Sequence, residues 1–199
     1  MTFNYFKNRV AADLIIVATK EVVFATMDQT DVSLIELDTT YGALTKQGVS
    51  SFKLTATDPA AETAVMNIGV PMTGVAELGL RRSYCRLTTP TVQVLEGDYR
   101  FLTSYPHRCS IVGGNSGSPV LDRSIKTILA LINTGSDDRS ASKPDCSLNK
   151  PCEWDNGVKI VKSDRNYAQS ISFISGCFSA DGVFNKTLPT CQSEKYQTK

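Results

Sequence analysis

The fold of this chain is decided by the stretch Gly113-Gly114-Asn115-Ser116-Gly117-Ser118-Pro119. A serine between glycines on a tight turn has an exposed hydroxyl, and the neighbouring backbone N–H groups are free to converge on one point. Pro119 closes the turn ahead of an apolar pair that is typical of a buried strand. A flexible Gly/Ser loop is the alternative interpretation, but seven residues between two strand-like runs favour a structured turn.

Short apolar runs alternate with turn residues on both sides of this stretch, which is the pattern of an all-β domain. They are rich in Val, Ile, Thr and aromatic residues, and helical periodicity is weak apart from a short helix expected at 165–175. A polar insertion at 136–151 is expected to form a surface loop. The predicted strands are 13–18, 22–25, 32–37, 51–56, 64–68, 83–87, 91–95, 100–103, 119–121 and 127–134.

The composition excludes several classes of protein. The chain has 199 residues, 41% of them hydrophobic, and carries 21 Lys+Arg against 20 Asp+Glu, a formal net charge of +1. This balance argues against a nucleic-acid-binding protein, which needs clustered positive charge. No run approaches the length of a membrane-spanning helix, so we expect no membrane partner.

The cysteines indicate three disulfides. The six cysteines contain no CxxC motif and the chain has one histidine, His107, so a zinc site has little support and we expect no metal and no cofactor. Six cysteines allow 15 pairings, and spacing alone favours pairing between neighbours. Disulfides imply an oxidising compartment, so the protein is expected to be secreted or periplasmic, although no signal peptide precedes Met1. The predicted pairs are Cys85–Cys109, Cys146–Cys152 and Cys177–Cys191.

A second motif leads to a family resemblance. The run Thr30-Asp31-Val32-Ser33-Leu34-Ile35-Glu36-Leu37 resembles the "D-I-A-L-L-x-L" strand of the chymotrypsin/trypsin-like serine peptidases, whose aspartate orients the catalytic histidine. The GNSGSPV loop resembles their nucleophile loop, most closely that of the bacterial glutamyl-endopeptidase-like (V8-like) branch. Asn67-Ile68-Gly69-Val70-Pro71 and the run LALINTG at 129–135 are also similar to the family, and the resemblance spans about residues 14–178.

The resemblance implies a trypsin-like double six-stranded antiparallel β-barrel with a short C-terminal helix. Residues 1–57 are expected to be the remnant of an incomplete first barrel, 58–178 the second barrel, and 179–199 a disulfide staple and tail. Ser116 would be the nucleophile, Asp31 the orienting carboxylate, and the N–H groups of Gly114 and Ser116 the oxyanion hole. The substrate, a peptide or protein, would be bound by Ser110, Asn133, Thr134 and Gly135.

Three positions depart from family patterns. Ser110, six residues before the nucleophile, is not a carboxylate, so a trypsin-like preference for Arg or Lys is not supported. The strand after the nucleophile reads Ile132-Asn133-Thr134, without the histidine that binds substrate acid in the glutamyl branch. Asn115 replaces the aspartate that pairs with a new N-terminus in the digestive enzymes. We therefore expect hydrogen bonds and Cys85–Cys109 to hold the loop.

The family's general base is missing from the sequence. No histidine precedes Asp31, and His107 is expected in the pocket wall. A serine hydroxyl is a weak nucleophile without a base, so the chain is expected to be an N-terminally truncated peptidase, a monomer nearly inert by itself. The alternative is a non-catalytic pseudopeptidase that binds a peptide or protein partner. A third, weaker hypothesis is a recognition module built around the Cys146–Cys152 loop.

Overall fold

The computed structural model describes residues 1–3, 10–72, 79–88, 90–124, 126–135 and 145–191. Contacts divide the chain into two compact units, one of residues 1–26 and 32–52, the other of residues 27–31 and 53–199. The sequence placed the domain boundary after residue 57, whereas the contacts group residues 27–31 and 53–57 with the second unit. Asp31 and Ser116 therefore belong to the same unit.

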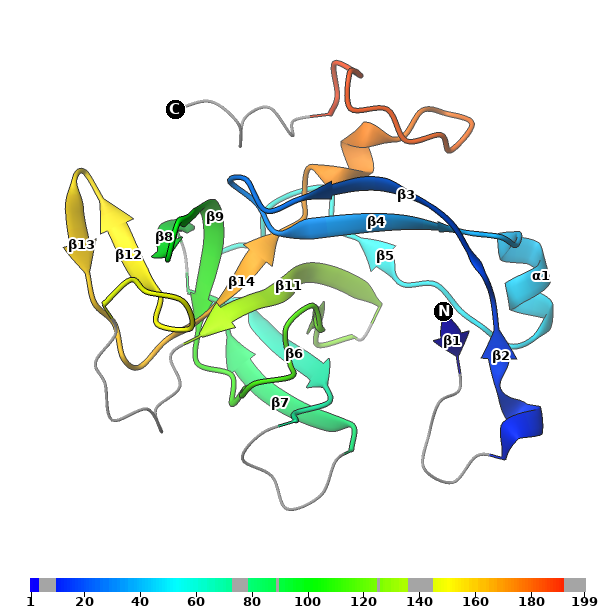
Figure 1. Ribbon diagram of the computed structural model, residues 1–199, viewed down its shortest axis with the longest axis horizontal. Coiled ribbons are helices and arrows are strands. Elements are labelled where there is room, and N and C mark those ends of the chain that lie inside the picture. The colour runs from blue at the N-terminus through cyan, green and yellow to red at the C-terminus, as the bar shows by residue number, and fades with distance from the viewer. Residues whose placement is uncertain (4–9, 73–78, 89, 125, 136–144, 192–199) are drawn as a thin grey trace. The chain divides into compact units, whose positions relative to one another are not determined.

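The first unit is built around an antiparallel hairpin of β3 and β4 (Figure 1). Thr40 caps a short α-helix of this unit by accepting a hydrogen bond from the Ala43 N–H at 3.1 Å. Ile16, Val22 and Ile35 expose large apolar side chains to solvent. The elements are β1 (Thr2–Phe3), η1 (Ala11–Asp13), β2 (Ile15–Ile16), β3 (Thr19–Thr26), β4 (Val32–Leu37) and α1 (Tyr41–Lys46).

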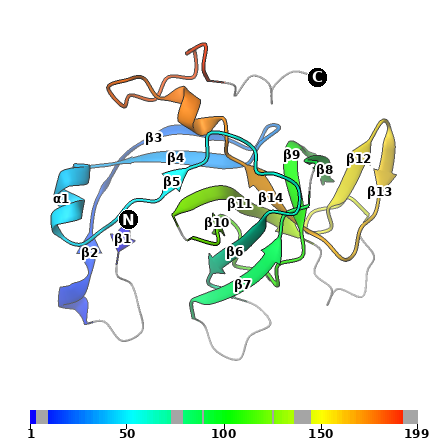
Figure 2. The same ribbon diagram turned by 180° about the vertical axis from the view of Figure 1, so that it is seen from behind.

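The second unit contains a barrel whose strands run antiparallel to their neighbours (Figures 1 and 2). Six strands follow one another around it in the order β7-β6-β10-β11-β14-β9, and β5 pairs with β11 in parallel. The elements are β5 (Lys53–Leu54), β6 (Ala64–Gly69), β7 (Arg81–Arg86), β8 (Val92–Glu96), β9 (Tyr99–His107), β10 (Pro119–Asp122), β11 (Thr127–Gly135), β12 (Cys152–Asp155), β13 (Val158–Ile160), β14 (Asn166–Ser170) and η2 (Ile174–Cys177).

The chain just after β7 closes the barrel against the end of β9. Leu87 forms an antiparallel bridge with His107, and the Thr88 N–H donates to the Pro106 carbonyl at 2.8 Å. These two contacts join the ends of the six-stranded path. The hairpin of β12 and β13 continues from β8 on the far side of β9. The interior is filled by Val65, Leu87, Tyr105, Cys109, Val120, Leu129, Ala130, Ile132 and Ala168.

The disulfide prediction is confirmed. Cys85–Cys109, Cys146–Cys152 and Cys177–Cys191 are all bonded, and no described cysteine is free. Cys85 lies on β7 and Cys109 follows β9, so their bond ties together the two strand ends that close the barrel. Most of the loop expected at 136–151 lies outside the described residues.

The predicted strands of the barrel are present, but the helix predicted at 165–175 is wrong over most of its length. Residues 166–170 form β14, and only Ile174–Cys177 are helical, as a 3-10 turn. The cause is that β14 is buried with polar side chains, which hides its strand pattern. Gln169 has no exposed surface, and its Nε2 donates to the Thr103 carbonyl at 3.0 Å. Strands β12 and β13 were missed as well.

Candidate functional site

The turn that carries Ser116 connects β9 to β10 and is held by backbone hydrogen bonds. The Asn115 N–H donates to the Val112 carbonyl at 3.1 Å, the Ser118 N–H to the Asn115 carbonyl at 2.9 Å, and the Gly117 N–H to the Ile132 carbonyl at 2.7 Å. Gly114 has φ +99° and Gly117 φ +77°, a backbone region in which only glycine is unstrained. The glycines of the motif are therefore required by the shape of the turn.

Ser116 is exposed at the tip of this turn with two uncommitted backbone donors beside it. Its hydroxyl makes one long hydrogen bond, 3.4 Å, to the Asn133 carbonyl. Among the described residues, the N–H groups of Gly114 and Ser116 donate to no acceptor, although those of Asn115, Gly117 and Ser118 all do. An anion next to the Ser116 hydroxyl could accept hydrogen bonds from these two N–H groups without displacing an acceptor among the described residues.

Asn115 anchors the turn from below. It is 4% exposed, and its Nδ2 donates to the Val112 carbonyl at 2.9 Å. Its Oδ1 lies against Gly69, where a Cβ would come within 2.1 Å of it. Asn67 adds a second anchor, because its Nδ2 donates to the Ser118 hydroxyl at 2.7 Å and to the Pro119 carbonyl at 3.0 Å. The loop is thus held by hydrogen bonds, as expected from the asparagine at position 115.

Ser116 opens onto a cleft of about 330 Å³. Three of the residues predicted to bind substrate, Asn133, Thr134 and Gly135, line it with Ser116, but Ser110 does not. Ser110 is exposed, and its N–H donates to the Ser83 hydroxyl at 2.7 Å. The other lining residues are Glu96, Ile111, Val112, Gly113, Asn115, Ile132, Asn149 and Asn166.

Several of these cleft residues carry no signal in the sequence. Glu96 ends β8 next to a Gly-Asp turn, and nothing local distinguishes it from an ordinary strand end. Asn166 begins β14, and its Nδ2 donates to the Cys109 carbonyl at 3.0 Å. Its Oδ1 lies 2.1 Å from where a Cβ on Gly135 would be, so Gly135 leaves the space that Asn166 fills. Only the pairing of β14 with β11 places Asn166 in the cleft.

Asp31 lies at the end of a short segment fixed to β9. The Leu102 N–H donates to the Gln29 carbonyl at 2.9 Å, and Thr30 is buried. Burial raises the pKa of the Asp31 carboxyl, and no hydrogen bond to this carboxyl is present among the described residues. The Asp31 carboxyl is thus half-buried and has no hydrogen-bond donor within the described part of the chain.

His107 does not serve as the base, and it does not line the cleft of Ser116 either, which corrects the expected position in the pocket wall. It is 1% exposed on β9, and its Nδ1 accepts a hydrogen bond from the Cys109 N–H at 3.2 Å. Burial lowers its pKa to about 4, partly offset by a backbone contact with Tyr167. Its ligand atom lies within 4.8 Å of those of Cys85 and Cys109, but the disulfide leaves no thiolate there for a metal.

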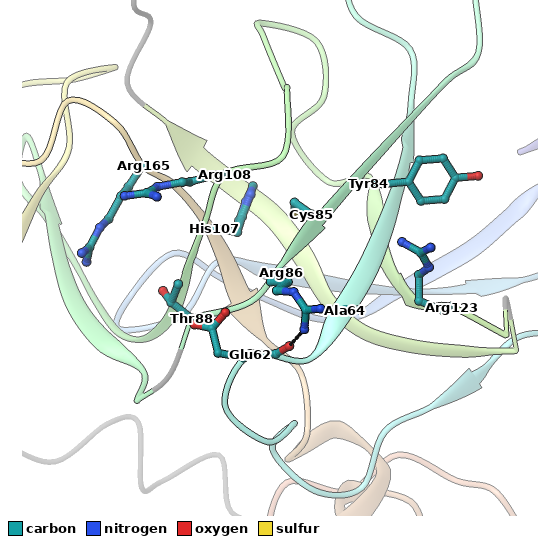
Figure 3. A pocket seen from close by; sticks show the side chains of 10 residues that line it. All are labelled: Glu62, Ala64, Tyr84, Cys85, Arg86, Thr88, His107, Arg108, Arg123 and Arg165. Atoms are coloured by element: carbon teal, nitrogen blue, oxygen red, sulfur yellow. Dashed lines mark hydrogen bonds between the residues drawn. The ribbon is translucent and has the colours of Figure 1, made fainter.

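A larger cavity, of about 710 Å³, lies on another part of the barrel and is lined by four arginines (Figure 3). Each guanidinium already has a contact. Arg108 pairs with Asp164 at 2.5 Å, and Arg165 with Glu153 at 2.9 Å. The other two are Arg86, which donates to the Glu62 carbonyl at 2.7 Å, and Arg123, which lies 4.8 Å from the centre of the Tyr84 ring. Because each arginine already has a partner within the protein, the cluster of four needs no bound ligand to account for it.

Comparisons with known proteins support the fold. No protein-family model and no curated protein matches the chain. The active form of the Rv3671c protease from M. tuberculosis is similar in structure, with a TM-score of 0.53 and 12% identity, over 84% of this chain and 59% of that chain. Two inactive forms of that protease have TM-scores of 0.49 and 0.48, at 12% and 13% identity, covering 83% and 78% of this chain and 64% and 63% of theirs.

This chain spans less than two thirds of the protease it resembles. At such low identity the likeness concerns the fold, and the predicted all-β, trypsin-like barrel fold is confirmed. Three disulfides suit an oxidising environment. Within the described residues, no helix has the length and apolar character needed to cross a bilayer.

Proposed function

We propose that this chain carries the nucleophile half of a serine endopeptidase of the chymotrypsin/trypsin-like superfamily. The observation behind the proposal is an exposed serine hydroxyl on a hydrogen-bonded turn where the N–H groups of Gly114 and Ser116 donate to none of the described acceptors. In a flexible Gly/Ser loop we would not expect hydrogen bonds to fix Asn115, Gly117 and Ser118 and to leave these two N–H groups without an acceptor. We propose the V8-like branch within this superfamily because the loop reads GNSGSPV, the form that resembles that branch.

The reaction uses these groups in order. The Ser116 hydroxyl loses its proton to a base as its oxygen bonds to the carbonyl carbon of the substrate peptide. The carbonyl oxygen becomes an anion and accepts hydrogen bonds from the Gly114 and Ser116 N–H groups, each of which contributes about 3–4 kcal/mol to the transition state. The C–N bond then breaks, the proton passes to the leaving amine, and water hydrolyses the acyl-enzyme.

The base is the part that these 199 residues do not supply. His107 is buried with a pKa of about 4 and does not line the cleft. Asp31 would orient an imidazole held by its carboxyl, and burial of Asp31 strengthens that hydrogen bond. We therefore propose that catalysis belongs to a longer form of the protein that carries a histidine before Asp31, acts on peptides outside the cytosol, and works as a monomer.

A pseudopeptidase that binds a peptide or protein partner is the second candidate. This candidate is favoured by Asp31, because its carboxyl has no hydrogen-bond partner among the described residues and so orients no base. The same cleft would then hold a peptide without cleaving it.

The two candidates are separated by an aryl phosphonate probe, which reacts only with an activated serine. The test uses the longer form with its upstream histidine, and compares wild type with Ser116→Ala and with Ser124→Ala, a matched exposed serine on the β10–β11 turn. The peptidase predicts labelling of wild type and Ser124→Ala and none of Ser116→Ala. Absence of labelling in the wild-type longer form would contradict the peptidase and support the pseudopeptidase.

A further inference from the structure

Glu96 is a buried acid in the wall of the Ser116 cleft. It ends β8, is 6% exposed, and lines the same cleft as Ser116 and Thr134. Its Oε1 accepts a hydrogen bond from the Asn149 N–H at 2.7 Å. A carboxylate has about four acceptor positions, so this single backbone bond leaves most of its capacity open to a ligand.

The other buried acid shows what Glu96 lacks. Among the described residues two carboxylates are buried, Glu96 and Glu153. Glu153 accepts hydrogen bonds from Arg165 at 2.9 Å and from the Tyr167 hydroxyl at 3.3 Å, so its charge is balanced inside the protein. Glu96 forms no ion pair with any described residue. Burying a carboxylate without a counter-charge is costly, and a cation that enters the cleft removes this cost.

The remaining walls suit a long side chain with a charged end. Ile111, Val112 and Ile132 give the cleft an apolar surface. Lys and Arg bury their methylene stems along such surfaces while the charged group reaches a polar partner. The cleft of about 330 Å³ has room for one such side chain.

We propose that Glu96 makes this cleft selective for a substrate side chain that carries a positive charge, Lys or Arg. The inference rests on the proposed function, because it assumes that the cleft beside Ser116 receives substrate. It also replaces the expectation drawn from Ser110, since the carboxylate comes from the β8–β9 hairpin and not from the residues just before the nucleophile.

Glu96 also holds the backbone of Asn149, so the test must separate its charge from this structural bond. Glu96→Gln keeps an Oε1 acceptor for the Asn149 N–H and removes the charge. Glu62→Gln is the matched control. Glu62 is an exposed acid of the same unit, and it lines the arginine cavity instead of the Ser116 cleft. The ligands are N-acetyl-arginine methylamide and its neutral isostere N-acetyl-citrulline methylamide. Binding is followed by NMR shifts of the Thr134 and Gly135 amides, and needs no catalysis.

The expected result is that the arginine ligand binds about 10- to 100-fold more tightly than the citrulline ligand, as for a hydrogen-bonded charge. Glu96→Gln should reduce this ratio to less than about threefold, whereas Glu62→Gln should leave it unchanged. Equal affinities in the wild type, no binding of either ligand, or a preference that survives Glu96→Gln would overturn the inference. Phosphonate labelling of Ser116 reports separately on the proposed function, so a failure of one is distinguishable from a failure of the other.

Discussion

Replacing Gly114 by alanine tests the geometry of the nucleophile turn, and Gly117→Ala is its matched control. Both glycines have positive φ, +99° and +77°, so a Cβ strains the backbone at either position by about 1–3 kcal/mol. Only at Gly114 does the Cβ also meet a neighbour, at 2.6 Å from the backbone nitrogen of Met72. At Gly117 nothing lies within 4 Å.

The difference between the two variants isolates the contact with Met72. Relieving it requires Met72 to move, which weakens the 2.8 Å hydrogen bond from the Met72 N–H to the Gly113 carbonyl. Overpacking of this kind costs about 1–3 kcal/mol. Gly114→Ala should therefore unfold with a free energy about 1–3 kcal/mol lower than Gly117→Ala, and a midpoint roughly 2–12 °C lower.

The assay is thermal and urea unfolding of the two variants and the wild type, followed by circular dichroism. Equal destabilisation by the two substitutions would refute the close approach of the turn to Met72. A stable Gly117→Ala at wild-type level would refute the positive φ at that position.

Three further predictions concern the scaffold of the site. Replacing Cys85 and Cys109 together by alanine should lower the free energy of unfolding by about 3–4 kcal/mol, against about 2 kcal/mol for Cys146 and Cys152, because the sequence separations are 24 and 6; equal losses in urea unfolding would contradict this. His107, with its pKa lowered from 6.5 to about 4, stays neutral when folded, so the unfolded chain takes up a proton first as the pH falls. Stability should drop by about 3 kcal/mol between pH 6.5 and 4, a component that is absent in His107→Asn; identical pH profiles of the two proteins would contradict it. Asn115→Asp should cost about 3 kcal/mol at pH 7, because it buries a charge and removes the donor to Val112, and this cost should shrink as the pH falls towards 4; a cost independent of pH would show that position 115 is not buried.

The sequence predicted the parts of the fold that follow local rules. The barrel strands with alternating apolar residues were located, and the spacing of cysteines gave the correct disulfides. It failed at β14, where Gln169 and Ser170 are buried by hydrogen bonds that no local pattern reveals. Helix α1 was missed because its six residues are too few to show periodicity.

The candidate site divides in the same way. The GNSGSPV turn is a local structure, so its glycines and its serine could be identified from their order alone. Glu96 and Asn166 reach the cleft only through the pairing of β8 with β9 and of β14 with β11. No short stretch of sequence predicts which strands will pair. Ser110 was expected in the pocket from its position in the motif; it is not among the residues that line the cleft, and its backbone N–H donates to the Ser83 hydroxyl.

The central claim is that the Gly114 and Ser116 N–H groups are set to receive an oxyanion formed at Ser116. The most direct measurement is a crystal structure of the aryl phosphonate adduct, prepared with the longer form proposed above. We expect phosphorus bonded to the Ser116 oxygen, and the phosphonyl oxygen within about 2.7–3.1 Å of both nitrogens. A phosphonyl oxygen that points to solvent, with neither N–H in reach, or a probe attached to another residue, would contradict the claim.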